Sequence, residues 1–189
     1  MTRGYYKKKL EEKDKIINLY KKEVELLKRQ LEVYKQAAYT DCLTNLDNRR
    51  SIENNDENFD SVILGDVDHF KNINDNFGHD LGDRVLVEIS KVFKRYVRES
   101  DLVCRWGGEE FVILLKNCDD SDAYNKALQL KEEIANLSEK FGFKITMSFG
   151  ISKIIGKTLK NAIEEADKAM YESKEKGRNT ITIFKLINE

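Results

Sequence analysis

Proline is absent from this chain of 189 residues, and neither a long apolar run nor an excess of one charge is present. The three cysteines, Cys42, Cys104 and Cys118, have no metal-ligand spacing, which excludes zinc and disulfide frameworks and predicts free thiols in a reducing compartment. The 33 Lys+Arg and 34 Asp+Glu leave a net charge of −1, so we expect no binding to nucleic acid. The longest apolar run, 111–115, is far too short to span a bilayer, and no secretory signal is visible. We therefore expect a cytoplasmic protein without membrane insertion.

The first 39 residues have the composition of an uninterrupted helix, with no glycine between Gly4 and Gly65. Apolar residues recur every seven positions at Leu10, Ile17, Val24, Leu31 and Ala38. A second heptad position is filled by Tyr20, Leu27 and Tyr34, with Lys13 as its polar exception. This pattern favours a parallel two-stranded coiled coil. The alternative is a single amphipathic helix packed on its own domain, whose apolar stripe is usually wider. We predict a dimerisation and signalling helix over 1–39 and a separate domain over 40–189.

Beyond residue 40 short β-type runs alternate with amphipathic helical patterns. The expected strands are 61–65, 102–106, 111–115, 143–151 and 180–184, and the apolar helical stripes are 85–96, 123–137 and 159–170. Gly107 and Gly108, between the second and third strands, are expected to form the two-residue turn of a tight hairpin. The pattern predicts an α+β fold with a mostly antiparallel sheet covered by helices.

Carboxylates follow two of these strands. Asp66 comes directly after the apolar run 61–65, while Glu109 and Glu110 follow the glycine turn. Two acids at a turn are usually only solvated, but if the strand 61–65 lies beside the hairpin, Asp66 and Glu109 can converge on a hard divalent cation such as Mg²⁺.

The stretch DVDHFKNINDNFGHDLGD at 66–83 is rich in groups that suit a nucleotide. It offers a lysine for phosphate, asparagine side chains for base edges, and glycines that allow close approach. The same composition is also typical of an ordinary loop that leads into a helix.

Four segments carry a resemblance to a known family: DCLTNLDNRR (41–50), DVDHFKNINDNFGHDLGD (66–83), RWGGEEF (105–111) and YESKEKGRN (171–179). In this order and at these spacings they resemble the GGDEF family of diguanylate cyclases, here in a GGEEF variant, over roughly residues 40–185. The resemblance implies a nucleotide-cyclase, palm-like (ferredoxin-like) fold. It also implies the condensation of two GTP into cyclic di-GMP and two pyrophosphates by a homodimer, in which each domain holds one GTP and the coiled coil brings the domains together.

The resemblance also implies roles for individual residues. Asp66, the backbone carbonyl of Val67 and Glu109 would bind Mg²⁺, with Mn²⁺ as an alternative, and Glu110 would support catalysis. GTP would be bound by Lys71, Lys174 and Arg178 through its phosphates and by Asn74 and Asp83 through its guanine. Arg98 and Asp101 of an R-x-x-D motif would bind cyclic di-GMP as an inhibitor. Asp41 and Arg49 are candidates for a structural hinge. Asp68 either shares the face of Asp66 or is structural.

Two other functions stay open. The domain could be a catalytically silent receptor for cyclic di-GMP, or a coiled-coil adaptor whose globular part only docks partners. No sensor domain is recognisable before the helix, so either regulation comes through the coiled coil or the chain is a fragment of a longer protein.

Overall fold

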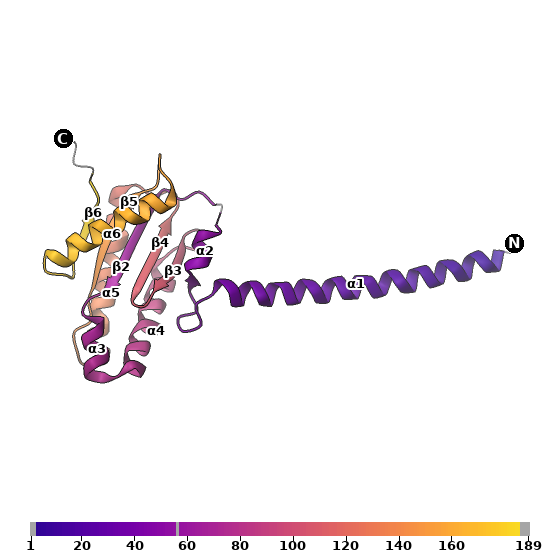
Figure 1. Cartoon of the computed structure of the whole chain (residues 1–189), viewed down its shortest axis with the longest axis horizontal. Helices are drawn as coiled ribbons and strands as arrows, with labels where there is room; N and C mark the ends of the chain where they lie inside the picture. The colour runs from indigo at the N-terminus through magenta and orange to yellow at the C-terminus, as the bar shows by residue number, and fades with distance from the viewer. Residues whose placement is uncertain (1–2, 56, 186–189) are drawn as a thin grey trace. The chain divides into compact units, whose positions relative to one another are not determined.

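The computed structural model describes residues 3–55 and 57–185, and the chain divides into two compact units, Met1–Tyr39 and Thr40–Glu189. The first unit is one helix, α1 (Arg3–Tyr39) (Figure 1). The predicted uninterrupted helix is thus confirmed. In the single chain its seam residues are open to solvent, with Ile17 49% and Leu27 56% exposed. The pairing of two such helices stays a prediction.

The second unit is built on a six-stranded sheet in the order β1-β3-β4-β2-β5-β6. Its strands are β1 (Asp47–Asn48), β2 (Ser61–Val67), β3 (Leu102–Gly107), β4 (Glu110–Leu115), β5 (Met147–Lys153) and β6 (Ile181–Ile183). The four central strands pair antiparallel, and only the edge strands β1 and β6 pair in parallel. This confirms the predicted α+β fold with a mostly antiparallel sheet.

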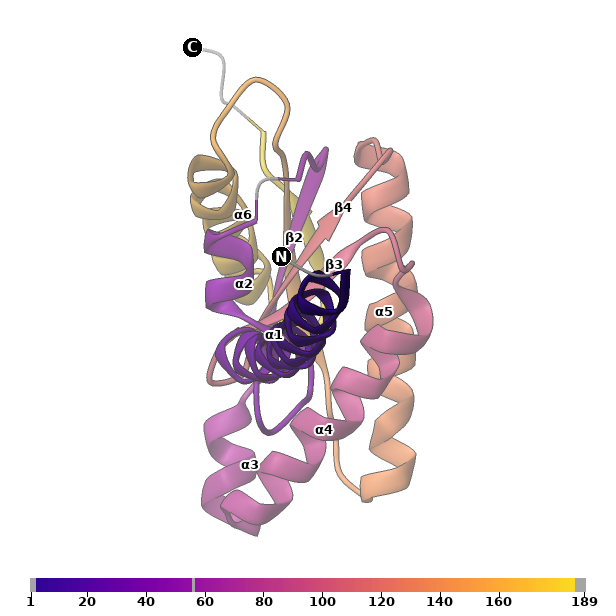
Figure 2. The ribbon, with the colours of Figure 1, turned by 90° about the vertical axis from the view of Figure 1, so that its right-hand side faces the viewer.

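The described part of this unit also contains five helices: α2 (Arg49–Glu53), α3 (Phe70–Phe77), α4 (His79–Tyr96), α5 (Asp120–Phe141) and α6 (Leu159–Glu175). Of these, α3 packs on α4. Figure 2 shows α4 and α5 on one face of the sheet and α2 and α6 on the other. Side-chain caps begin the two long C-terminal helices, because Asp119 accepts from the backbone N–H of Asp122 and Thr158 from that of Asn161.

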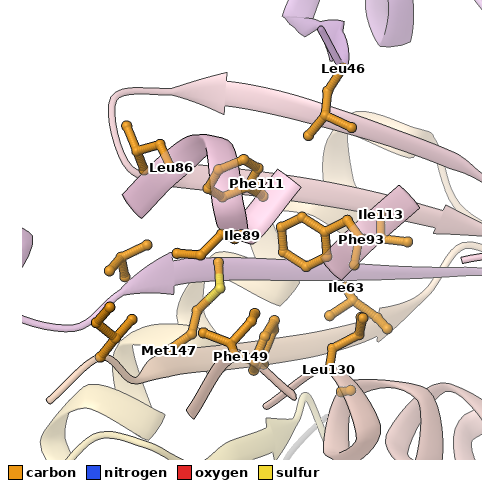
Figure 3. Packing of buried hydrophobic residues seen from close by; sticks show 14 of the residues in the cluster. Leu46, Ile63, Leu86, Ile89, Phe93, Phe111, Ile113, Leu130, Met147 and Phe149 are labelled. Atoms are coloured by element: carbon orange, nitrogen blue, oxygen red, sulfur yellow. The ribbon is translucent and has the colours of Figure 1, made fainter. Parts of the chain in front are cut away.

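The sheet separates two hydrophobic clusters, and every residue of the central strand β2 is buried. Side chains alternate across it. Ile63 belongs to the cluster under α4 and α5, with Phe93, Phe111 and Phe149 (Figure 3), whereas Leu64 belongs to the cluster under α2 and α6. Burial on both faces explains why this strand reads as a continuous apolar run.

Three elements escape the sequence patterns, namely β1, α2 and α3, and β5 begins at Met147 where the pattern starts the strand at Phe143. Phe143 lies before the strand and stacks on Phe77 of α3, with ring centroids 4.5 Å apart. Its apolar character therefore serves contact with a helix. The three cysteines are unpaired, as predicted.

Candidate active site

The end of β2 and the β3–β4 turn bring the predicted carboxylates together. In the antiparallel register of β2 and β4, Asp66 lies directly opposite Glu110, and the backbone N–H of Val67 donates to the carbonyl oxygen of Glu109 at 3.3 Å. Asp66 is only 7% exposed. The structure thus makes the central strand and the hairpin immediate neighbours, as the sequence interpretation required.

Lys174 of α6 joins this group of acids, with its Nζ 2.8 Å from Oδ2 of Asp66. The close packing of α6 on β5 depends on Gly150, since a Cβ there would lie 2.0 Å from the carbonyl oxygen of Ala166. Burial raises the pKa of the Asp66 carboxyl, and the negative charge of Glu109 adds to this effect, although the Lys174 ammonium opposes it. The site therefore concentrates negative charge that one lysine only partly compensates.

Glu110 belongs to the same electrostatic group. Its pKa is raised by burial first and then by the charges of Asp66 and Asp167, while Lys174 acts in the opposite direction. Together with Asp167 and Trp106, Glu110 lines a groove of about 740 Å³ between α2 and α6. Asp167 has no counterpart among the predicted site residues, because only the packing of α6 on β2 and β5 brings it near Glu110.

Asp68, whose role the sequence left open, has a fully engaged carboxylate. It is 4% exposed and accepts hydrogen bonds from the hydroxyls of Thr146 at 2.7 Å and Ser148 at 2.6 Å, and from the backbone N–H of Asn179 at 2.9 Å. Arg178 and Asn179 both have left-handed backbones, with φ of 67° and 48°. Asp68 therefore anchors the turn that carries Arg178, which favours the structural interpretation.

The predicted guanine-contacting residues lie on two consecutive helices. Asn74 is on α3 and Asp83 on α4, and the helices meet at Gly78, whose φ of 84° and hydrogen bond to the Asn74 carbonyl end the first helix. The side-chain oxygen of Asn74 is buried and has no hydrogen-bond partner within residues 3–55 and 57–185, whereas Asp83 is exposed. The predicted phosphate ligands Lys71 and Arg178 are also exposed.

The oxygen ligands present suit a hard cation that shares its coordination with a substrate. Among residues 3–55 and 57–185 no group of three or more His, Cys, Asp or Glu side chains is arranged to hold a metal ion. Asp66 and Glu109 supply two carboxylates, and the carbonyl of Val67 is the third predicted ligand. Mg²⁺ usually binds proteins through one or two carboxylates and takes its other oxygens from phosphate and water, so this ligand set fits it.

Arg105 is a site residue to which the sequence assigned no role. Its Nε donates to the carbonyl oxygen of Gly108 in the hairpin turn at 2.8 Å, and its guanidinium lies 3.2 Å from Asp41. Burial would raise the pKa of Asp41, but hydrogen bonds from Thr44 and the charge of Arg105 outweigh it and lower the pKa. The segment that follows α1 is thus tied to the turn that presents Glu109. In the sequence, the only indication of this role was the position of Arg105 two residues before the Gly-Gly turn.

The R-x-x-D pair forms a turn after α4. The backbone N–H of Asp101 donates to the carbonyl of Arg98 at 3.0 Å, and the Asp101 carboxylate accepts from the backbone N–H of Lys116 at 3.1 Å. Arg98 is exposed. The other hinge candidate, Arg49, lies over the ring of Trp106 at 4.4 Å and pairs with Glu53.

The chain is similar to a known protein family and to several of its members. The family described as "Diguanylate cyclase, GGDEF domain" matches residues 38–180. Diguanylate cyclase A of Treponema denticola is 40% identical over 130 residues, which cover 66% of this chain and 35% of that protein. Response regulator PleD of Caulobacter vibrioides is 33% identical over 178 residues, covering 85% of this chain and 39% of that protein. The chain therefore spans well under half the length of these curated relatives.

A solved structure resembles both units. The coiled coil and GGDEF domain of DgcB from Caulobacter crescentus, in complex with c-di-GMP, gives a TM-score of 0.79 at 28% identity and covers 90% of this chain and 98% of that one. In the described part of the present chain, no helix is both long and apolar enough to cross a membrane.

Proposed function

We propose that this chain, which belongs to the GGDEF family of diguanylate cyclase domains, condenses two GTP molecules into cyclic di-GMP with release of two pyrophosphates. The observation that supports this proposal most is the cluster of acidic residues at the end of β2, where Asp66 lies opposite Glu110 and beside Lys174. Acids with a neighbouring lysine suit a reaction in which a metal-bound triphosphate must be held and its charge neutralised.

Each protein group has a task in this reaction. Asp66, Glu109 and the carbonyl of Val67 would hold Mg²⁺, or Mn²⁺ in its place. When bound, this ion polarises the α-phosphate, helps to neutralise the leaving pyrophosphate and favours deprotonation of the attacking 3′-hydroxyl. Lys174 lies 2.8 Å from the carboxylate of Asp66 and would contact phosphate oxygens adjacent to the metal. Glu110 supports catalysis from the same cluster.

Three exposed side chains and one half-buried side chain would bind the rest of GTP. Lys71 and Arg178 are exposed cations that can reach phosphate oxygens, and Arg178 offers the forked donors that suit them. The carboxylate of Asp83 can accept from N1–H and N2–H₂ of guanine, which adenine lacks, and Asn74 provides an amide for the same base.

The reaction joins two substrates, so two domains that each hold one GTP must face each other. We assign this pairing to the apolar seam of α1, whose exposed side chains suit a homodimeric coiled coil. The similarity to a structure that contains a coiled coil and a GGDEF domain supports this assignment. Product inhibition is assigned to Arg98 and Asp101, and the exposed guanidinium of Arg98 suits a phosphate of cyclic di-GMP.

Glu109→Gln tests the site assignment. It removes one carboxylate charge at nearly constant size, so pyrophosphate release from GTP with Mg²⁺ should fall to background while the urea unfolding midpoint stays close to that of the wild type. Glu139→Gln makes the same chemical change at an exposed position of α5 and should retain full activity. If Glu109→Gln turns over GTP at the wild-type rate, the metal assignment is wrong. A folded wild-type chain that binds cyclic di-GMP but never turns over GTP would favour the silent receptor.

A further inference from the structure

Gly82 of α4 lies against the side chain of Asn74 on α3. A Cβ placed on Gly82 would be 1.9 Å from Oδ1 of Asn74 and 3.1 Å from its Cγ, whereas the ring of Phe70 is 3.2 Å away. The Asn74 oxygen occupies the space that any other residue at position 82 would fill. That oxygen is also buried and has no hydrogen-bond partner among the described residues.

This contact determines where the Asn74 amide lies. With Oδ1 buried against Gly82, the side-chain nitrogen is the end left for binding, and an amide nitrogen is a hydrogen-bond donor. The residue after Gly82 is the exposed carboxylate of Asp83, which only accepts. The two helices thus provide a donor and an acceptor next to each other, and guanine offers both carbonyl and ring-nitrogen acceptors and N–H donors.

We propose that Gly82 is a positioning residue for guanine recognition. Its missing side chain leaves the space in which the Asn74 amide lies, and so holds that amide beside Asp83 for contact with the base. This inference rests on the proposed function, in which Asn74 and Asp83 bind the guanine of GTP. Gly82 itself does not contact the substrate.

Alanine at position 82 should displace Asn74 without unfolding the domain. Gly82 lies inside α4, where alanine is a better helix former than glycine, and its backbone is outside the left-handed region. The atoms that a new methyl group meets first are at the end of the Asn74 side chain, which can rotate away, and no backbone atom is among the three nearest.

The kinetic test compares Gly82→Ala, Asn74→Ala and the double variant with the wild-type chain. Loss of one hydrogen bond to the base should raise KM for GTP about tenfold in Gly82→Ala, with kcat at saturation nearly unchanged. In the Asn74→Ala background the same substitution should have almost no effect, because the side chain that it displaces is gone. Gly4→Ala is the matched control, since Gly4 is a helical glycine with nothing within 4 Å of a new Cβ.

A measurement without nucleotide separates this inference from the proposed function. The side-chain amide resonances of Asn74 in an NMR spectrum should shift in Gly82→Ala and stay unchanged in Gly4→Ala. Unchanged resonances would overturn the positioning role, and so would an unchanged KM or a KM effect that persists in full without Asn74. If the wild-type chain does not turn over GTP, the proposed function fails, while the spectra still decide whether Gly82 fixes Asn74.

Discussion

Replacement of Asp68 with alanine should destabilise the catalytic domain by about 3 kcal/mol. The carboxylate accepts three hydrogen bonds, from Thr146, Ser148 and the backbone of Asn179, at 2.6–2.9 Å. Hydrogen bonds to a charged group contribute about 1.5–3 kcal/mol each, or about 4.5–9 kcal/mol in total. Burial of the carboxylate offsets several kcal/mol of this sum, and about 3 kcal/mol remains.

Urea unfolding followed by circular dichroism measures this loss directly. For a slope of about 2 kcal/mol per molar urea, the midpoint should fall by about 1.5 M. Asp68→Asn keeps the shape and one acceptor oxygen, so its loss should be about half as large. The control is Asp75→Ala, which removes an exposed carboxylate on α3 and should leave the midpoint nearly unchanged.

The same experiment distinguishes the two roles that the sequence left open for Asp68. A structural acceptor that anchors the turn of Arg178 predicts a large loss of stability and, in the folded fraction, a raised KM for GTP. A metal ligand predicts wild-type stability with a weakened Mg²⁺ dependence. A stability loss below about 1 kcal/mol in Asp68→Ala would refute the structural role, because three buried charge-assisted hydrogen bonds cannot be lost at so small a cost.

Four further substitutions test other contacts of the domain and the helix seam. Glu110→Gln removes the like charge opposite Asp66 and should stabilise the fold at pH 7 by about 0.2–1 kcal/mol in thermal unfolding. Because the pKa of Glu110 is raised in the fold, this gain should vanish as the pH falls through that pKa, and a gain that grows on acidification would contradict it. Arg105→Met should cost about 1–3 kcal/mol and slow turnover. Asp41→Asn should add little to Arg105→Met in a double-mutant cycle, whereas full additivity would contradict a direct link. Leu27→Asp in the seam should convert the dimer to a monomer in light scattering and lower the activity per chain, and a persistent dimer would contradict the coiled-coil assignment.

Local patterns were sufficient for the elements that bury a regular apolar face. The stripe that begins at Val85 became α4, and the continuous apolar run at 61–65 became the central strand β2. In contrast, α3 contains three asparagines, which are poor helix formers, and burial of Phe70 and Ile73 stabilises it. Its helical state depends on tertiary packing, and the two-residue strand β1 depends on pairing with the distant strand β3.

The candidate site also contains residues that the sequence reveals and residues that only the folded structure places. Asp66 and Glu109 were recognisable because each follows a strand or a turn that the sequence marks clearly. The contacts of Asp68 were not, since its partners lie 78, 80 and 111 residues further along the chain. The contact between Gly82 and Asn74 likewise depends on how α3 and α4 pack, and Gly82 precedes the apolar stripe 85–96 from which the helix was predicted.

The identity of the reaction product tests the proposed cyclase activity most directly. The purified chain would be incubated with GTP and Mg²⁺ and its products identified by mass spectrometry, with ATP in place of GTP and a sample without metal as controls. Cyclic di-GMP should form only when both GTP and the metal are present. A folded, dimeric chain that yields no cyclic di-GMP under these conditions would contradict it.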